Sequence, residues 1–133
     1  MKPKARIAAI IVQDGKLLML HGKGYTELWT PGGKADGEET DEECLKRELK
    51  EEIGVNLLEA KFFKEYQTYS FYHSKRAMLE RVYIAKIEGD IKPNAEIESI
   101  VWLSKEDFEK MKYPMITHIE KELIPDLVLG KVW

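Results

Sequence analysis

The segment GKADGEETDEECLKRELKEEIGV, residues 33–55, contains the clearest helix signal in this sequence. Thr40 followed by Glu43 has the spacing of a capping box, in which each side chain bonds the other residue's backbone N–H at a helix start. Gly54 stands where a glycine commonly ends a helix. Between these ends, apolar residues recur every four positions and form one stripe: Leu45, Leu49 and Ile53. The pattern predicts an amphipathic helix over residues 40–53.

Three glutamates of this helix share a face beside the apolar stripe. Glu48, Glu51 and Glu52 are spaced i, i+3 and i+4, which at about 100° per residue places them together at the edge of the buried surface. Like charges at this spacing destabilise an isolated helix by roughly a few tenths of a kcal/mol per pair. A bound cation relieves that repulsion. The arrangement favours Mg²⁺, which takes carboxylate, water and phosphate oxygens as ligands.

The loop before the helix adds groups that suit phosphate binding. Gly32 and Gly33 let the backbone approach a ligand closely, and Lys34 supplies positive charge. Acidic runs at a helix start are often only solvated, because acids are favourable near the helix N-terminus. The residue pattern alone therefore leaves a binding site and a solvated helix start both open.

The order of these residues resembles the signature of the Nudix (MutT-like) hydrolase family. That signature is glycine, five residues, glutamate, seven residues, then Arg-Glu-aliphatic-any-Glu-Glu-any-Gly-aliphatic. Its positions are filled here by Gly33, Glu39, Arg47, Glu48, Leu49, Glu51, Glu52, Gly54 and Val55. At residue frequencies of roughly 7%, a chance match to the fixed positions is on the order of one in 10⁸ per starting position. The preceding WTPGGK, residues 29–34, is also similar to the family's sequence.

The resemblance implies a fold and a reaction. The implied fold is α+β, an α/β/α sandwich with a mixed β-sheet between helices. The implied reaction is attack of water on a diphosphate phosphorus, in nucleoside di- or triphosphates or related nucleoside diphosphate derivatives. It depends on Mg²⁺, with Mn²⁺ as an alternative ion, because a divalent ion neutralises phosphate charge and lowers the pKa of bound water. A dinucleoside polyphosphate hydrolase and a nucleotide-sensing domain without catalysis are the alternatives.

The resemblance also implies roles for particular residues. The expected metal ligands are the Gly33 carbonyl and the carboxylates of Glu48, Glu51 and Glu52. A further acidic ligand in the family precedes the last strand, and Glu96 matches its position better than Glu98 does. The expected catalytic residues are Arg47, Glu48 and Glu51: the arginine orients the glutamates, and Glu48 is the expected general base. Glu39 is expected to support the loop.

The group beyond the diphosphate is only weakly indicated. The candidate substrate-binding residues are Lys34, His21, Trp29, Tyr72 and Thr117. Members that act on oxidised guanine nucleotides carry an arginine about where His21 stands and an asparagine about where Thr117 stands, so both departures weaken that assignment. Tyr72 lies 17 residues past Val55, where dinucleoside polyphosphate hydrolases tend to carry a tyrosine. The rings of Trp29 and Tyr72 suit stacking on a base, although packing within a strand explains them equally.

The rest of the chain reads as alternating strands and helices. We expect strands over 5–12, 16–21, 57–72, 77–87 and 99–103, and helices over 105–111 and 116–124. Asp14-Gly15 predicts a hairpin turn, residues 73–75 are expected to join the two long strands, and Pro125 is expected to end or kink the last helix. This order favours a mixed sheet with helices on its faces.

Length and composition set the broad class. The 133 residues suit one domain spanning 1–133. A formal net charge of −3 argues against stable nucleic-acid binding, and no apolar run is long enough for a membrane helix. One cysteine, Cys44, excludes an intrachain disulfide and fits a reducing compartment. We therefore expect a cytoplasmic protein that binds a small nucleotide and no membrane, and we leave a homodimer open.

Overall fold

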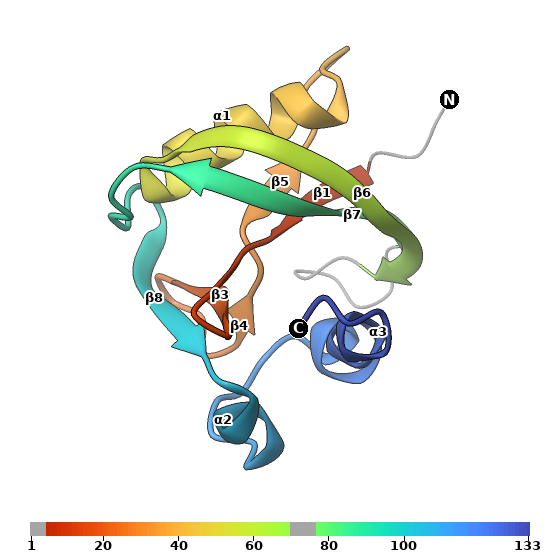
Figure 1. The fold of residues 1–133 in the computed structure, drawn as a ribbon. Coiled ribbons are helices and arrows are strands. Elements are labelled where there is room, and N and C mark those ends of the chain that lie inside the picture. The colour runs from red at the N-terminus through yellow and green to blue at the C-terminus, as the bar shows by residue number, and fades with distance from the viewer. Residues whose placement is uncertain (1–4, 70–76) are drawn as a thin grey trace.

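The computed structural model describes residues 5–69 and 77–133 and divides the strands between two sheets (Figure 1). The first sheet has the order β5 (Gly32–Lys34), β1 (Ala5–Ile10), β7 (Ala77–Glu88) and β6 (Asn56–Tyr69). Its β1 and β7 are parallel and its other neighbours antiparallel, so this sheet is mixed, as predicted. The second sheet is antiparallel and consists of β2 (Val12–Gln13), β3 (Lys16–Gly22), β4 (Leu28–Trp29) and β8 (Ile97–Leu103).

The chain passes from the first sheet to the second one just before the N-terminal hairpin. The predicted strand over residues 5–12 is interrupted at Ile11, where the chain leaves the mixed sheet and enters the second one. Asp14 and Gly15 both have positive φ angles, 51° and 75°, which is the backbone of a two-residue hairpin turn. The hairpin between β2 and β3 therefore forms at the predicted place.

Helix α1 (Asp41–Ile53) has the predicted ends and the predicted buried face. The Glu43 N–H donates to Thr40 Oγ1 at 3.1 Å, and the Thr40 N–H donates to Glu43 Oε1 at 3.0 Å, which completes the capping box. Gly54 ends the helix with a φ of 69°. The apolar stripe is fully buried: Leu45, Leu49 and Ile53. The helix lies along the mixed sheet (Figure 1).

Strand β7 connects two helical layers because alternate side chains of a strand point to opposite faces. On one face, Arg81 donates to Asp41 at the start of α1, at 2.6 and 2.8 Å. On the other face, Glu80 lies 3.0 Å from His118, next to the C-terminal helical segment. The mixed sheet thus lies between helices, which confirms the expected α+β fold of the Nudix type.

The C-terminal helical segment differs from the prediction. It comprises a π-helical turn, η1 (Ile119–Leu123), followed directly by α3 (Ile124–Leu129). Of the two effects expected of Pro125, an end or a kink, the structure excludes the end, because the helical segment continues to Leu129. The Ile124 N–H donates to the Ile119 carbonyl across five residues, and this wider turn precedes Pro125, which has no N–H to donate and whose ring disturbs a regular α-helix.

The remaining helix, α2 (Lys105–Glu109), is shorter than predicted and is capped by Ser104, whose hydroxyl accepts from the Asp107 N–H. The predicted connection at 73–75 and the end of the long strand at 70–72 lie outside the described residues. None of the described helices is both long and apolar enough to span a membrane.

Candidate active site

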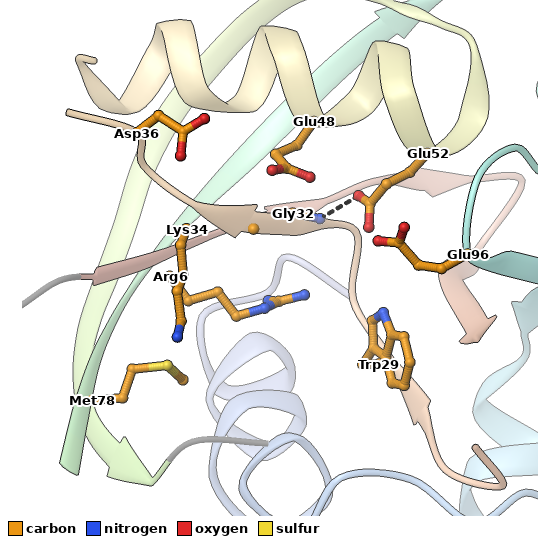
Figure 2. A pocket seen from close by; sticks show the side chains of 10 residues that line it. Arg6, Trp29, Gly32, Lys34, Asp36, Glu48, Glu52, Met78 and Glu96 are labelled. Atoms are coloured by element: carbon orange, nitrogen blue, oxygen red, sulfur yellow. Dashed lines mark hydrogen bonds between the residues drawn. The ribbon is translucent and has the colours of Figure 1, made fainter. Parts of the chain in front are cut away.

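A cavity of about 340 Å³ opens between α1, β5, β1 and the loop before β8 (Figure 2). Its lining comprises Arg6, Trp29, Gly32, Gly33, Lys34, Asp36, Glu48, Glu52, Met78 and Glu96. Seven of the residues singled out in the sequence are therefore brought to one place: Trp29, Gly32, Gly33, Lys34, Glu48, Glu52 and Glu96. They come from segments far apart in the chain.

Two carboxylates of the cavity, Glu52 and Glu48, stand in surroundings that disfavour their charged forms. Glu52 is 4% exposed, and this burial raises the pKa of its carboxyl to about 8, although the Gly32 N–H donates to it at 2.9 Å. Burial also raises the pKa of Glu48, against the opposing effect of the adjacent Arg47 guanidinium. Glu96 faces the same cavity from the loop before β8. A cation in the cavity would stabilise the ionised form of all three side chains.

Gly33 makes room for one of these carboxylates. A Cβ at this position would lie 2.4 Å from Cδ of Glu48 and 2.6 Å from its Oε1, closer than any ordinary contact. The absence of a side chain at Gly33 therefore lets the Glu48 carboxylate lie directly against β5. The Gly33 carbonyl faces α1, since Cys44 Sγ lies 3.5 Å from its oxygen.

The Arg47 guanidinium ties the loop before α1 to the helix itself. Its Nε and Nη2 donate to the two oxygens of Glu39 at 2.8 and 2.9 Å, and Nη2 also donates to the Lys34 carbonyl at 3.1 Å. Its Nη1 donates to Glu48 at 2.8 Å and lies 3.5 Å from the Glu51 carboxylate. The paired arginine holds the pKa of Glu39 at about 2, so this carboxylate stays ionised. Arg47 thus positions Glu48 on the helix, and Glu39 together with the rest of the loop.

The oxygen groups of the cavity fit a hard divalent cation. Glu48, Glu52 and Glu96, with the carbonyl of Gly33 nearby, offer oxygen atoms only, which is the chemistry that Mg²⁺ and Mn²⁺ accept. Within residues 5–69 and 77–133, no three His, Cys, Asp or Glu side chains converge into a ready-made metal cage. Mg²⁺ usually keeps several waters and takes few protein ligands together with substrate phosphates, so an open set of donors suits it.

Three of the other candidate residues do not line this cavity. Glu51 is not part of the lining, and its side chain is 56% exposed. His21 lies on β3, where its ring contacts the Tyr25 carbonyl and Glu98, and Thr117 is exposed before η1. Neither His21 nor Thr117 reaches the cavity. Tyr72 lies outside the described residues.

The structure adds three lining residues that the sequence analysis did not single out as site residues: Arg6, Asp36 and Met78. Arg6 is the most informative of them, because it is buried and its neighbours come from distant segments. It donates to the Thr30 carbonyl at 2.6 Å and to Glu80 at 3.2 Å, and Glu80 in turn lies 3.0 Å from His118. The one signal in the sequence was an arginine inside an otherwise apolar strand.

Comparison with known proteins assigns the family. A family model described as NUDIX domain matches residues 1–127. This chain belongs to the Nudix family. It is 29% identical to the CTP pyrophosphohydrolase of Escherichia coli K12 over 113 residues, which cover 82% of this chain and 80% of that protein.

Two further comparisons support the family and its fold. The 8-oxo-dGTP diphosphatase of Haemophilus influenzae is 47% identical over 68 residues, which cover 47% of this chain and 50% of that protein. A Nudix hydrolase from Nitrosomonas europaea superposes with a TM-score of 0.80 at 23% identity, covering 98% of this chain and 91% of that one. The last likeness concerns the fold alone. Membership of the family makes the chain a Nudix hydrolase, and such hydrolases act on small nucleotide substrates with divalent metal ions.

Replacing Gly33 by alanine should remove activity with little loss of stability. The new methyl group meets the mobile end of the Glu48 side chain, which has to move away from β5. Gly32→Ala is the matched control: there a Cβ meets the Ile7 carbonyl oxygen at 2.0 Å, a backbone atom that cannot move alone, and φ is +138°. We expect Gly32→Ala to lower the free energy of unfolding in urea by at least about 2 kcal/mol. Equal stability losses in the two variants would contradict this assignment of the two glycines.

His118 should make stability depend on pH. Burial lowers the pKa of this imidazole, but its contacts with Glu80 and Glu122 more than offset that effect, so the folded-state pKa lies above the usual 6.5. The folded state therefore holds the proton more tightly, and the stability it contributes is fully present below pH 6.5 and lost as pH rises through the folded pKa. Urea denaturation across this pH range should give the free energy of unfolding of the native protein and of His118→Gln. The difference between the two free energies should become smaller as the pH rises. A difference that is constant or grows would refute it.

Proposed function

We propose that this chain, as one Nudix domain over residues 1–133, is a Mg²⁺-dependent hydrolase that cleaves nucleoside triphosphates to the monophosphate and pyrophosphate. The observation that carries the proposal is the cavity in which Glu48, Glu52 and Glu96 face one another beside Gly33 and Lys34. Carboxylates that line a cavity next to an exposed lysine suit a divalent cation and the phosphates that it binds.

In this proposal the side chains of the cavity have separate tasks. Glu48, Glu52 and Glu96, with Glu51 and the Gly33 carbonyl, would hold the divalent ion, which when bound neutralises phosphate charge and lowers the pKa of a water ligand. Glu48 is also the general base that takes the proton from the attacking water.

Two basic residues complete the proposed machinery. Arg47 fixes one oxygen of Glu48 at 2.8 Å and so orients the carboxylate toward the cavity. Lys34, exposed at the cavity rim, neutralises a phosphate oxygen.

The relatives support nucleoside triphosphates as the substrate class. The protein from E. coli is named for CTP and the protein from H. influenzae for 8-oxo-dGTP, and both names describe cleavage of a diphosphate linkage. The expected contacts of His21 and Thr117 with substrate find no support, because neither residue lines the cavity. The carboxylates of the cavity therefore support the proposal that a diphosphate linkage is cleaved. The names of the relatives support the proposal that the substrate is a nucleoside triphosphate.

A nucleotide screen with Mg²⁺ and with Mn²⁺ tests the proposal. Release of phosphate and of pyrophosphate should be followed separately for each nucleoside di- and triphosphate and for dinucleoside polyphosphates. We expect pyrophosphate from triphosphates, only with the metal present. Metal binding without turnover of any compound would contradict the proposal and favour a nucleotide-sensing domain.

Loss of one carboxylate of the cavity should abolish most turnover. Glu52→Gln and Glu96→Gln keep the size of the side chain but remove a charge that stabilises the transition state, so kcat should fall at least about 100-fold. Glu51→Gln should change kcat in the same direction. Glu98→Gln is the matched control, since Glu98 pairs with His21 outside the cavity, and its kcat should stay normal. Circular dichroism checks that each variant is folded. Near-normal kcat in Glu52→Gln would overturn the site.

A further inference from the structure

The buried Arg6 side chain is a charged group of the cavity wall that the diphosphate site does not require. It lies on β1 and is 6% exposed, yet it lines the cavity. The carboxylates that suit the metal and the exposed Lys34 already provide for the phosphates. A second, buried cation therefore calls for a different explanation.

The guanidinium of Arg6 is fixed by a chain of buried polar groups. Its Nη1 donates to Thr30 Oγ1 and to Glu80 Oε2, both at 3.2 Å, and its Nη2 donates to the Thr30 carbonyl at 2.6 Å. The other Glu80 oxygen lies 3.0 Å from His118 Nε2, and Tyr66 packs edge-on against the His118 ring. Glu80 and Thr30 are fully buried. Glu80 therefore contacts Arg6 through one oxygen and His118 through the other.

Stability does not account for this network. Transferring a guanidinium and a carboxylate out of water costs several kcal/mol per ion, and apolar residues of the same volume are often neutral or stabilising in their place. The ion pair of Arg6 and Glu80 does, however, hold the Arg6 guanidinium in place as a hydrogen-bond donor at the cavity wall. Fixed donors are what a binding site needs in order to distinguish one ligand from another.

The position of Arg6 points to the part of the substrate that it meets. Figure 2 shows Glu48 and Glu52 on the α1 side of β5, and Arg6, Trp29 and Met78 on its other side. The diphosphate belongs with the carboxylates, so the remainder of the nucleotide extends toward the apolar surfaces of Trp29 and Met78. These surfaces suit a base and not a phosphate.

We propose that Arg6 determines base specificity by donating a hydrogen bond to a carbonyl oxygen of the nucleobase, with Glu80 and His118 as its positioning residues. This rests on the proposed function, because it takes a nucleotide as the substrate. Guanine, cytosine and uracil carry such a carbonyl, and adenine carries none. A site built to hydrogen-bond one group of its substrate rejects an analogue that lacks that group.

The test compares kcat/KM for GTP, CTP, UTP and ATP with saturating Mg²⁺. We expect the three carbonyl bases to exceed ATP by about ten-fold or more. Arg6→Lys keeps the charge opposite Glu80 but loses the planar donor, and should bring the ratio of GTP to ATP toward one through KM and not through kcat. Arg6→Met with Glu80→Leu, which removes both charges together, should do the same. Arg81→Lys, the same change in an arginine–carboxylate pair on the opposite face of β7, should leave the ratio unchanged.

Equal kcat/KM for all four nucleotides in the native protein would overturn the proposal. So would a uniform loss on all four in Arg6→Lys, because a phosphate contact or a purely structural role produces that pattern. If no triphosphate is cleaved, the proposed function fails, and Arg6 is then tested by calorimetric binding of GMP, CMP and AMP. Tighter binding of GMP and CMP that Arg6→Lys removes supports its role, and equal binding of all three refutes it.

Discussion

The Arg47 guanidinium is the interaction on which the geometry of the site depends. It belongs to α1 but bonds both oxygens of Glu39 and the Lys34 carbonyl in the preceding loop, and on the helix it bonds Glu48. One planar group therefore sets the loop, the helix and a carboxylate relative to one another. Lysine offers no comparable fork, because its ammonium is a single charge on a flexible stem. The glycines before the loop let β5 approach close enough for this arrangement to form.

The same packing creates an energetic imbalance that a ligand corrects. Glu48 and Glu52 lie where α1 packs against β5, and burial there raises the pKa of both carboxyls. The fold thus holds acids where their charged forms are disfavoured. Such a site suits a divalent cation and the phosphates that accompany it. On the other side of β5, Arg6, which is paired with the buried Glu80, provides a positively charged side chain in the same cavity.

The sequence was sufficient for the elements whose causes are local. The capping box of Thr40, the glycine at the end of α1 and the hairpin at Asp14-Gly15 depend on neighbouring residues, and all three form as predicted. The signature placed Glu48, Glu52 and Gly33 at one cavity because a helix and its preceding loop are adjacent in the chain.

Features that depend on distant partners could not be predicted in the same way. Arg6 meets Glu80 across 74 residues, so no local pattern marks the pair, and the interruption at Ile11 depends on which strands the neighbouring sheets supply.

The central claim is that the cavity binds a divalent cation through Glu48, Glu52 and Glu96, and direct titration with Mn²⁺ followed by electron paramagnetic resonance tests it without any substrate. We predict that the native protein binds Mn²⁺ at millimolar concentration or below, that Mg²⁺ displaces it, and that the variant with all three residues changed to glutamine does not bind it although it is folded. Equal binding by the native protein and the folded triple variant, or no binding by either, would contradict the account.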